Sequence, residues 1–262
     1  MRSTCIIASI ALAAAAHAQF AAKVISYDPG SAAGNGYNSP KTALGRPERF
    51  TGEGVFPSAV TPFNSPFGTD EIVTIGGGGH LTVKFDSPVI NDPQNPFGID
   101  LLVFGNAFYF DKAWPTGVVG MVDDEGGLIE VSADGTTWHK VTGVSADGNY
   151  PTLGYRDLTD PYALTPGLKN TSFQRPVDPA FDPIDKSFAE ILAAYNGSGG
   201  GAGVDIGALG LTEVSYVRVS HALGLPGAPD IDAFVDVRAV PAPGLGALTL
   251  VGLLALRRRR EA

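Results

Sequence analysis

Cysteine is almost missing from this chain, since Cys5 is the only one in 262 residues. It lies in an apolar run that follows Arg2 and precedes Ala16-His17-Ala18, a cleavage site of the small-x-small type. This pattern is typical of a secretory signal peptide, so we expect residues 1–18 to be removed; a buried first helix is the alternative. The mature protein would then contain no thiol, which excludes disulfide bonds and thiol chemistry.

Basic residues are scarce too: the sequence has 18 Lys and Arg against 27 Asp and Glu, a formal net charge of −9. Arg2 and the arginines at 257–260 lie in the terminal segments, so the body between them is more acidic still. An acidic surface repels nucleic acid and anionic lipid, and we expect no nucleic-acid partner. Divalent cations and neutral partners suit such a surface better.

Long hydrophobic runs are absent as well. The C-terminal apolar segment, residues 245–256, is shorter than the roughly 20 residues that a membrane-crossing helix requires. It could insert part of the way, with the four arginines that follow held on the cytoplasmic side. We therefore expect a transient association with the membrane through this segment.

The order of features in residues 240–262 resembles the sorting tail of PEP-CTERM bacterial surface proteins. A short motif comes first, then the apolar segment, then the arginine cluster; the motif consists of Val240, Pro241, Ala242, Pro243 and Gly244. The resemblance implies a partner, the membrane protease-transpeptidase exosortase, and delivery to the cell surface or extracellular matrix. Pro241-Ala242-Pro243 departs from the usual Pro-Glu-Pro, and a permanent C-terminal anchor is the alternative.

Between the termini, frequent glycine and proline leave little room for long helices. Short stretches with alternating or continuous apolar residues predict strands instead. We expect one all-β domain over residues 19–239, an antiparallel two-sheet sandwich with one short helix at 184–195 in a long loop. The expected strands are residues 23–27, 71–75, 80–86, 99–104, 127–132, 137–142, 214–220 and 230–240.

The segment LIEVSADGTTWHKV, residues 128–141, is similar to a strand-turn-strand of discoidin-type, galactose-binding-like domains. That resemblance implies a jelly-roll-type sandwich with Trp138 packed in its core. The order of motifs over residues 23–262 further resembles exported PEP-CTERM surface proteins, most of which have no assigned activity. Their buried strand often reads Asp-x-x-Val-Phe-Glu-Asn, whereas here Gly105 precedes Asn106.

Acidic residues in two turn-rich regions suggest a structural calcium site, because Ca²⁺ takes six to eight oxygen ligands from flexible loops. If the sandwich brings the first and last strands together, the two regions would share one site. The alternative is that these residues are ordinary turn formers. The candidate ligands are Asp86, Asn91, Asp92, Asp100, Asp230 and Asp232.

Aromatic residues suggest a carbohydrate-binding face, for which Tyr109, Trp114 and Tyr155 are the candidates. Signals of catalysis are poor. His80, His139 and His221 lack metal-ligand spacing, and the acidic run at 123–125 is a weak sign of a glycoside hydrolase. We therefore expect a non-enzymatic binding module for polysaccharide or surface proteins, with a calcium-organised structural matrix protein as the alternative.

Overall fold

The structure, a computed structural model, describes residues 20–31 and 36–238. The expected signal peptide and the expected sorting motif at 240–244 lie outside the described residues. Within them the chain is an all-β sandwich, as the sequence predicts. The finer jelly-roll assignment stays a prediction.

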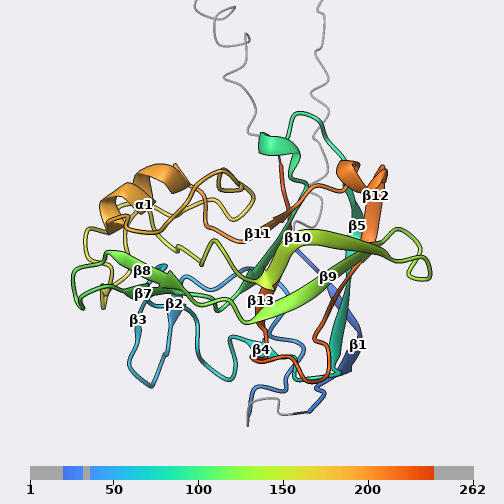
Figure 1. Ribbon diagram of the computed structural model, residues 1–262, viewed down its shortest axis with the longest axis horizontal. Helices are drawn as coiled ribbons and strands as arrows, with labels where there is room; N and C mark the ends of the chain where they lie inside the picture. Colours follow the sequence, from blue (N-terminus) through green and yellow to red (C-terminus); the bar gives the residue numbers. More distant parts are fainter. Residues whose placement is uncertain (1–19, 32–35, 239–262) are drawn as a thin grey trace, which may run out of the picture.

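One layer is a five-stranded antiparallel sheet in the order β1-β5-β12-β9-β10 (Figure 1). These strands are β1 (Lys23–Asp28), β5 (His80–Ile90), β12 (Glu213–Ser220), β9 (Gly126–Ser132) and β10 (His139–Asp147). The turn between β9 and β10 is held by Asp134, whose Oδ1 accepts from the backbone N–H groups of Thr136 and Thr137 at 2.7 and 2.8 Å. Gly135 follows with a φ of 79°, which glycine adopts without strain.

The second layer is a four-stranded sheet in the order β11-β6-β13-β4. Its strands are β11 (Ala202–Val204), β6 (Leu101–Gly105), β13 (Asp230–Asp236) and β4 (Val73–Thr74). Strand β13 pairs antiparallel with both β6 and β4, so the C-terminal strand of the described chain lies inside this sheet.

The main core lies between the two layers. Leu81, Val83 and Phe85 of β5 face it, as their alternation predicts, together with Phe234 of β13; each is at most 1 % exposed. Burying such a side chain contributes about 1.5–3 kcal/mol. The alternating strand patterns thus place the polar residues between them, such as Lys84, on the outer face.

A second cluster covers the other face of the four-stranded sheet. Leu102 and Phe104 of β6 pack there with Ala233 and Val235 of β13. Strand β6 is therefore buried on both faces, which its continuous apolar sequence predicts. In β13 the alternation of Ile231, Ala233 and Val235 predicts one buried face and places Asp232 on the solvent side. This prediction was wrong, because Asp232 is only 1 % exposed.

A third apolar cluster forms a lobe beside the sandwich, on the left of Figure 1. It is built around Phe63, Tyr109, Phe188 and Tyr195. Its strands form two small two-stranded sheets and were not predicted, because two to four residues are too few to show a periodicity. They are β2 (Phe50–Thr51), β3 (Ser58–Ala59), β7 (Tyr109–Asp111) and β8 (Val119–Val122).

The helix of this lobe, α1 (Phe188–Tyr195), starts four residues later than predicted. Ser187 caps it: the Ser187 hydroxyl accepts from the N–H of Glu190 at 3.4 Å, and the Glu190 carboxylate accepts from the N–H of Ser187 at 2.9 Å. This capping box fixes the first turn. The helix ends at Asn196, which takes the left-handed conformation with a φ of 47°. Two short 3₁₀ turns complete the helical content of the described ranges, η1 (Pro96–Gly98) and η2 (Gly207–Leu209).

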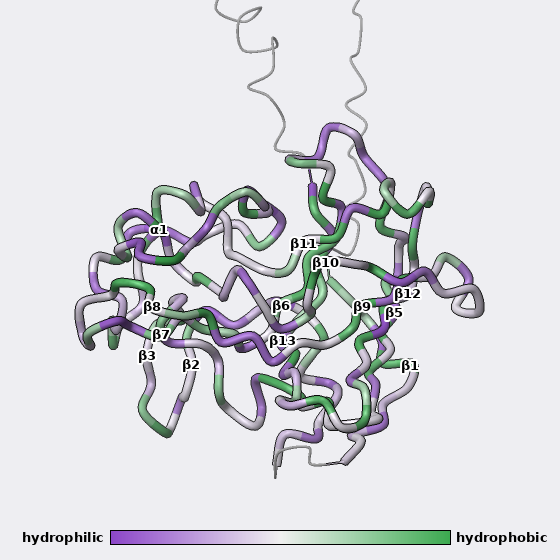
Figure 2. The backbone as a smooth tube through the Cα atoms, viewed as in Figure 1, coloured by the Kyte–Doolittle hydropathy of each residue, from purple (hydrophilic) through white to green (hydrophobic). Residues whose placement is uncertain are grey.

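Hydrophobic and hydrophilic residues alternate at short intervals along the chain (Figure 2). Among the described residues, no helix is long and apolar enough to cross a membrane.

Candidate functional site

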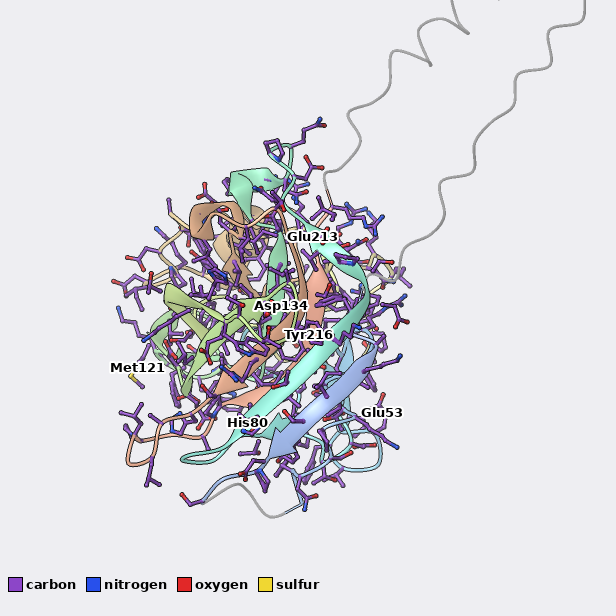
Figure 3. All side chains as sticks on the ribbon, turned by 90° about the vertical axis from the view of Figure 1, so that its right-hand side faces the viewer. Glu53, His80, Met121, Asp134, Glu213 and Tyr216 are labelled. Atoms are coloured by element: carbon purple, nitrogen blue, oxygen red, sulfur yellow. The ribbon has the colours of Figure 1, made fainter. Side chains whose placement is uncertain are left out.

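A groove of about 430 Å³ opens on the outer face of the five-stranded sheet, at the end where β5 and β9 begin. Polar side chains that line it come from four of the five strands, β5, β12, β9 and β10, and from the residue that follows β12. They are His80, Glu130, Lys140, Arg218, Ser220 and His221. Figure 3 looks toward this side of the molecule, with His80 at one end of β5 and Glu213 near the other.

The strand register brings these side chains together in two rows. His80 lies opposite Ser220 in the next strand. In the neighbouring row, two residues along β12, Arg218 lies opposite Glu130 on β9, and Glu130 lies opposite Lys140 on β10. Because directly opposed residues of an antiparallel pair point to the same face, each row forms a line of neighbours across the sheet.

Arg218 is held in place on two sides. Its Nε donates to Oε2 of Glu130 at 2.8 Å, and its guanidinium carbon lies 4.2 Å from the centre of the Trp138 ring. A cation over an aromatic face adds about 0.5–2 kcal/mol to such packing. Trp138 is therefore half-buried on the outer face of the sheet, which corrects the expectation that it packs in the core.

His221 contributes an unused hydrogen-bonding group to the groove. The residue is 4 % exposed, and among the described residues no hydrogen-bond partner reaches its Nε2. Its backbone is fixed by two bonds to the glycine turn, since its carbonyl accepts from Gly78 at 2.8 Å and its N–H donates to Gly79 at 3.2 Å. A buried polar atom without a partner costs about 1–3 kcal/mol.

A serine lies within hydrogen-bonding distance of one of the histidines that line the groove. Ser26 Oγ lies 3.1 Å from Nε2 of His80. The two nearby glycine amides are already engaged, because Gly78 donates to the carbonyl of His221 and Gly79 donates to that of Gly76. An oxyanion would find no donor in these two groups.

The first set of expected calcium ligands surrounds the loop between β5 and β6. Asp100 is fully buried, and its Oδ1 accepts from Asp92 N at 3.0 Å and from Asn95 Nδ2 at 2.9 Å. Burial raises the pKa of the Asp100 carboxyl, although these hydrogen bonds oppose the shift. Asp86 is exposed, and Asn91 donates to the carbonyl of Leu211.

The second set lies elsewhere. Asp230 is near Asn106, whose Nδ2 donates to it at 3.1 Å, whereas Asp100 lies beside Val237 at the other end of β13. Asp232 accepts from the backbone of Glu48 at 3.0 Å. The structure therefore does not bring the two sets into one shared site. Within residues 20–31 and 36–238, no group of three or more His, Cys, Asp or Glu is placed to hold a metal ion. A structural calcium ion stays a prediction.

Carboxylates that sequence reasoning did not connect gather near Asp230. Asp147 is fully buried, and burial raises its pKa well above the usual range, with further repulsion from Asp230 and Glu125. Burial, together with repulsion from Asp230 and Asp123, also raises the pKa of Glu125 to about 7. Glu125 is not among the residues that line the groove. The glycoside hydrolase hypothesis stays a prediction.

Two of the three expected ligand-binding aromatics are buried. Tyr109 is 1 % exposed and donates its hydroxyl to the carbonyl of Asn149 at 2.9 Å, and Tyr155 is 8 % exposed. Both belong to the apolar cluster of the lobe. Contrary to the expectation, neither ring offers an open face to a sugar.

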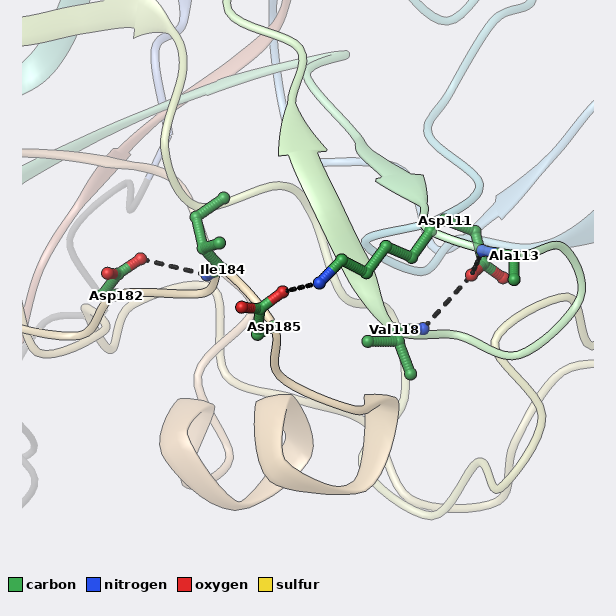
Figure 4. Close-up of polar contacts among 7 residues, drawn as sticks. Asp111, Ala113, Val118, Asp182, Ile184 and Asp185 are labelled. Atoms are coloured by element: carbon green, nitrogen blue, oxygen red, sulfur yellow. Dashed lines mark hydrogen bonds and ion pairs between the residues drawn. The ribbon is translucent and has the colours of Figure 1, made fainter.

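Trp114 is 75 % exposed, in a loop that Asp111 holds together. Oδ1 of Asp111 accepts from the N–H of Ala113 at 3.1 Å and from that of Val118 at 3.4 Å (Figure 4). The Trp114 ring lies 6.1 Å from that of Tyr162, so it has a neighbour on one side. It is the one expected aromatic ligand residue that the described structure leaves accessible.

The groove residues were missed because a sequence does not show which strands are neighbours. The only signal was the polar alternation in VSYVRVS and LIEVS, which places Arg218 and Glu130 on an outer face. No known family model matches the chain, and no curated protein matches it.

Proposed function

We propose that the chain is an exported, non-catalytic binding module that takes part of a polysaccharide into the groove on its five-stranded sheet. The observation that carries this proposal is the groove itself, a space of about 430 Å³ on the outer face of the sheet that is lined by charged and polar side chains. Its place is set by the strand register and by the two backbone bonds of His221, so the site is built before any ligand arrives.

The chemistry of the groove suits a sugar. A saccharide hydroxyl both donates and accepts, and the groove offers donors in Lys140, Arg218 and His221 beside acceptors in Glu130 and Ser220. A volume of about 430 Å³ lies in the range of small-molecule sites. The groove therefore fits one or two sugar units of a longer chain.

Export is the second part of the proposal and rests on the termini. The segment at 1–18 has the pattern of a signal peptide, and that at 240–262 resembles an exosortase sorting tail. The mature protein then starts at Gln19 and works at the cell surface or in the extracellular matrix. Mass spectrometry of surface extracts tests this, and intact residues 1–262 recovered from cytosol would contradict it.

The binding test is a pull-down of the producing cell's own exopolysaccharide, with and without calcium. His221→Phe removes Nε2 and keeps an aromatic ring, and we expect it to reduce the bound polysaccharide at least fivefold. His139→Phe is the matched control, because His139 is on β10 but does not line the groove. Equal binding by the wild type and both variants would refute the groove as the site.

A structural, calcium-organised matrix protein is the alternative. The observation in its favour is Asp147, whose pKa is raised by burial and by repulsion from Asp230 and Glu125, although in the described residues these carboxylates are not placed to hold a metal ion together. Such repulsion is relieved when a divalent cation neutralises the carboxylates. The pull-down separates the two functions, because the matrix function requires calcium and leaves the His221 variant unimpaired.

A further inference from the structure

The charge of the groove differs in sign from that of the chain. The chain carries a formal net charge of −9. Among the described residues that line the groove, Lys140 and Arg218 face a single carboxylate, Glu130. The lining therefore has a positive surplus in an otherwise acidic protein.

The surplus is confined to the groove. Farther along the same face, Lys84 on β5 is followed by the exposed Asp86, and Glu213 begins β12 at the far end (Figure 3). At the edge, Asp28 lies opposite His80 and uses its Oδ1 to accept the N–H of Gly30 at 3.0 Å. Basic and acidic side chains are thus mixed outside the groove.

The carboxylate of Glu130, the single one among the described residues that line the groove, already forms an ion pair. Oε2 of Glu130 accepts from Arg218 at 2.8 Å, and the two side chains are only 19 % and 29 % exposed. This bond engages one of the five N–H donors of the guanidinium. Lys140 lies opposite Glu130 on β10, with its residue exposed. The positive charge that remains faces the solvent side of the groove.

We infer that the sugar held in the groove is a uronic acid residue of an acidic polysaccharide, with its carboxylate toward Lys140, Arg218 and His221. This inference rests on the proposed function and names its ligand class. The carboxylate matches the local surplus of charge, because Lys140 and Arg218 can both donate charge-assisted hydrogen bonds to it. The net charge of the whole chain favours a neutral partner. A ligand inside the groove is attracted mainly by the charges within a few ångströms of it, and these have a positive surplus.

A nucleic acid or an anionic membrane fits less well. Both present closely spaced phosphates over a long surface, and the mixed charges outside the groove, with a net charge of −9 for the chain, oppose them. A polysaccharide presents one carboxylate per sugar, and the groove can hold it alone.

The test compares polygalacturonate with the same polymer after chemical reduction of its carboxyl groups to alcohols. Titration calorimetry on the full mature chain gives the affinity for each. We expect the reduced polymer to bind at least tenfold more weakly, and 0.5 M NaCl to remove most of the difference. Lys140→Gln should weaken binding of polygalacturonate about fivefold and leave the reduced polymer unaffected. Lys169→Gln, an exposed lysine outside the groove, is the control and should change neither.

Each of the following outcomes would contradict the inference that the groove binds a uronic acid. Equal affinity for the two polymers, or binding of neither, overturns it; the proposed function then stands or falls separately on the pull-down of the cell's own exopolysaccharide. Equally tight binding of duplex DNA or of vesicles containing phosphatidylserine also overturns it, since charge alone would then account for the affinity. Circular dichroism of each variant confirms that it is folded.

Discussion

The carboxylate of Asp147 fills the space beside the α-carbon of Gly105. It accepts from the N–H of Ala107 at 2.6 Å and from that of Asp230 at 3.0 Å, so it joins the chain after β6 to the start of β13. A Cβ on Gly105 would overlap Oδ1 of Asp147 and lie 2.6 Å from the carbonyl oxygen of Asp230. Glycine at this position, where the resembling proteins often have glutamate, is thus required by a carboxylate that comes from another strand.

We predict that Gly105→Ala destabilises the protein, because the backbone of β13 cannot move away without breaking its ladder with β6. Overpacking of this kind costs about 1–3 kcal/mol, which corresponds to a drop in Tm of about 2–12 °C for a domain of this size. Thermal unfolding followed by circular dichroism measures it. Gly77→Ala is the control, since its Cβ would meet only the hydroxyl of Ser31 at 3.2 Å and the Leu223 side chain and Cα at 3.6 Å. Equal Tm values for the two variants would contradict the steric account.

Stability should fall as the pH rises from 5 to 8. Burial and neighbouring carboxylates raise the pKa of Glu48 and of Glu125 from the usual 4.5 to about 7. The folded state then holds protons that the unfolded chain has released, so this stabilisation is complete below pH 4.5 and is lost as the pH passes 7. Below pH 4 other groups act in the opposite direction, since hydrogen bonds lower the pKa of Asp111 to about 2.

The measurement is Tm across pH 5 to 8 at constant ionic strength. Glu125→Gln should flatten the upper part of the curve, whereas the exposed Glu213→Gln should leave it unchanged. Both groups with raised pKa are partly in contact with water, which reduces the size of the effect. A Tm that climbs over this interval would refute the prediction.

The sandwich could be predicted from the sequence because strand alternation reports burial directly. Leu81, Val83 and Phe85 repeat every second residue, and continuous apolar residues mark β6 as buried on both faces. The lobe could not be predicted, since its strands are short and its cluster joins residues as far apart as Phe63 and Phe188. Asp232 was misplaced because a register shift in β13 and the apolar cover on its second face are invisible in one strand's pattern.

The groove, too, could be predicted from the sequence only in part. Outward positions of Arg218 and Glu130 follow from their own strands, but their contact depends on the order β12-β9, which no local pattern encodes. His221 lies just after β12, where nothing in the sequence marks its ring as buried.

Calcium should raise Tm more at pH 8 than at pH 5. Protons compete with the cation for the carboxylates of Asp147, Asp230 and Glu125, whose raised pKa values keep them partly protonated in acid. Calcium at about 100 times its Kd adds about 2.7 kcal/mol to the free energy of unfolding.

Differential scanning calorimetry with 5 mM CaCl₂, with EDTA and with NaCl of equal ionic strength measures the shift in Tm. Asp230→Asn should abolish it, whereas Asp100→Asn, in the loop between β5 and β6, should leave it unchanged. If calcium shifts Tm at neither pH, the prediction of a structural calcium ion is wrong.

Fluorescence should report ligand binding through Trp138 and not through Trp114. The sequence has two tryptophans, and only Trp138 lies under Arg218, with the guanidinium carbon 4.2 Å from the ring centre. A ligand that engages this guanidinium changes the charge over the indole ring, and the emission spectrum responds to that field.

We expect the Trp114→Phe variant to keep the full titration signal and the same Kd as the wild type, because Trp114 stands in the lobe. The Trp138→Phe variant should lose the signal while calorimetry still detects binding, weakened about threefold by the smaller aromatic face under Arg218. A signal that disappears with Trp114 instead would move the binding site from the sheet to the exposed loop that Asp111 holds.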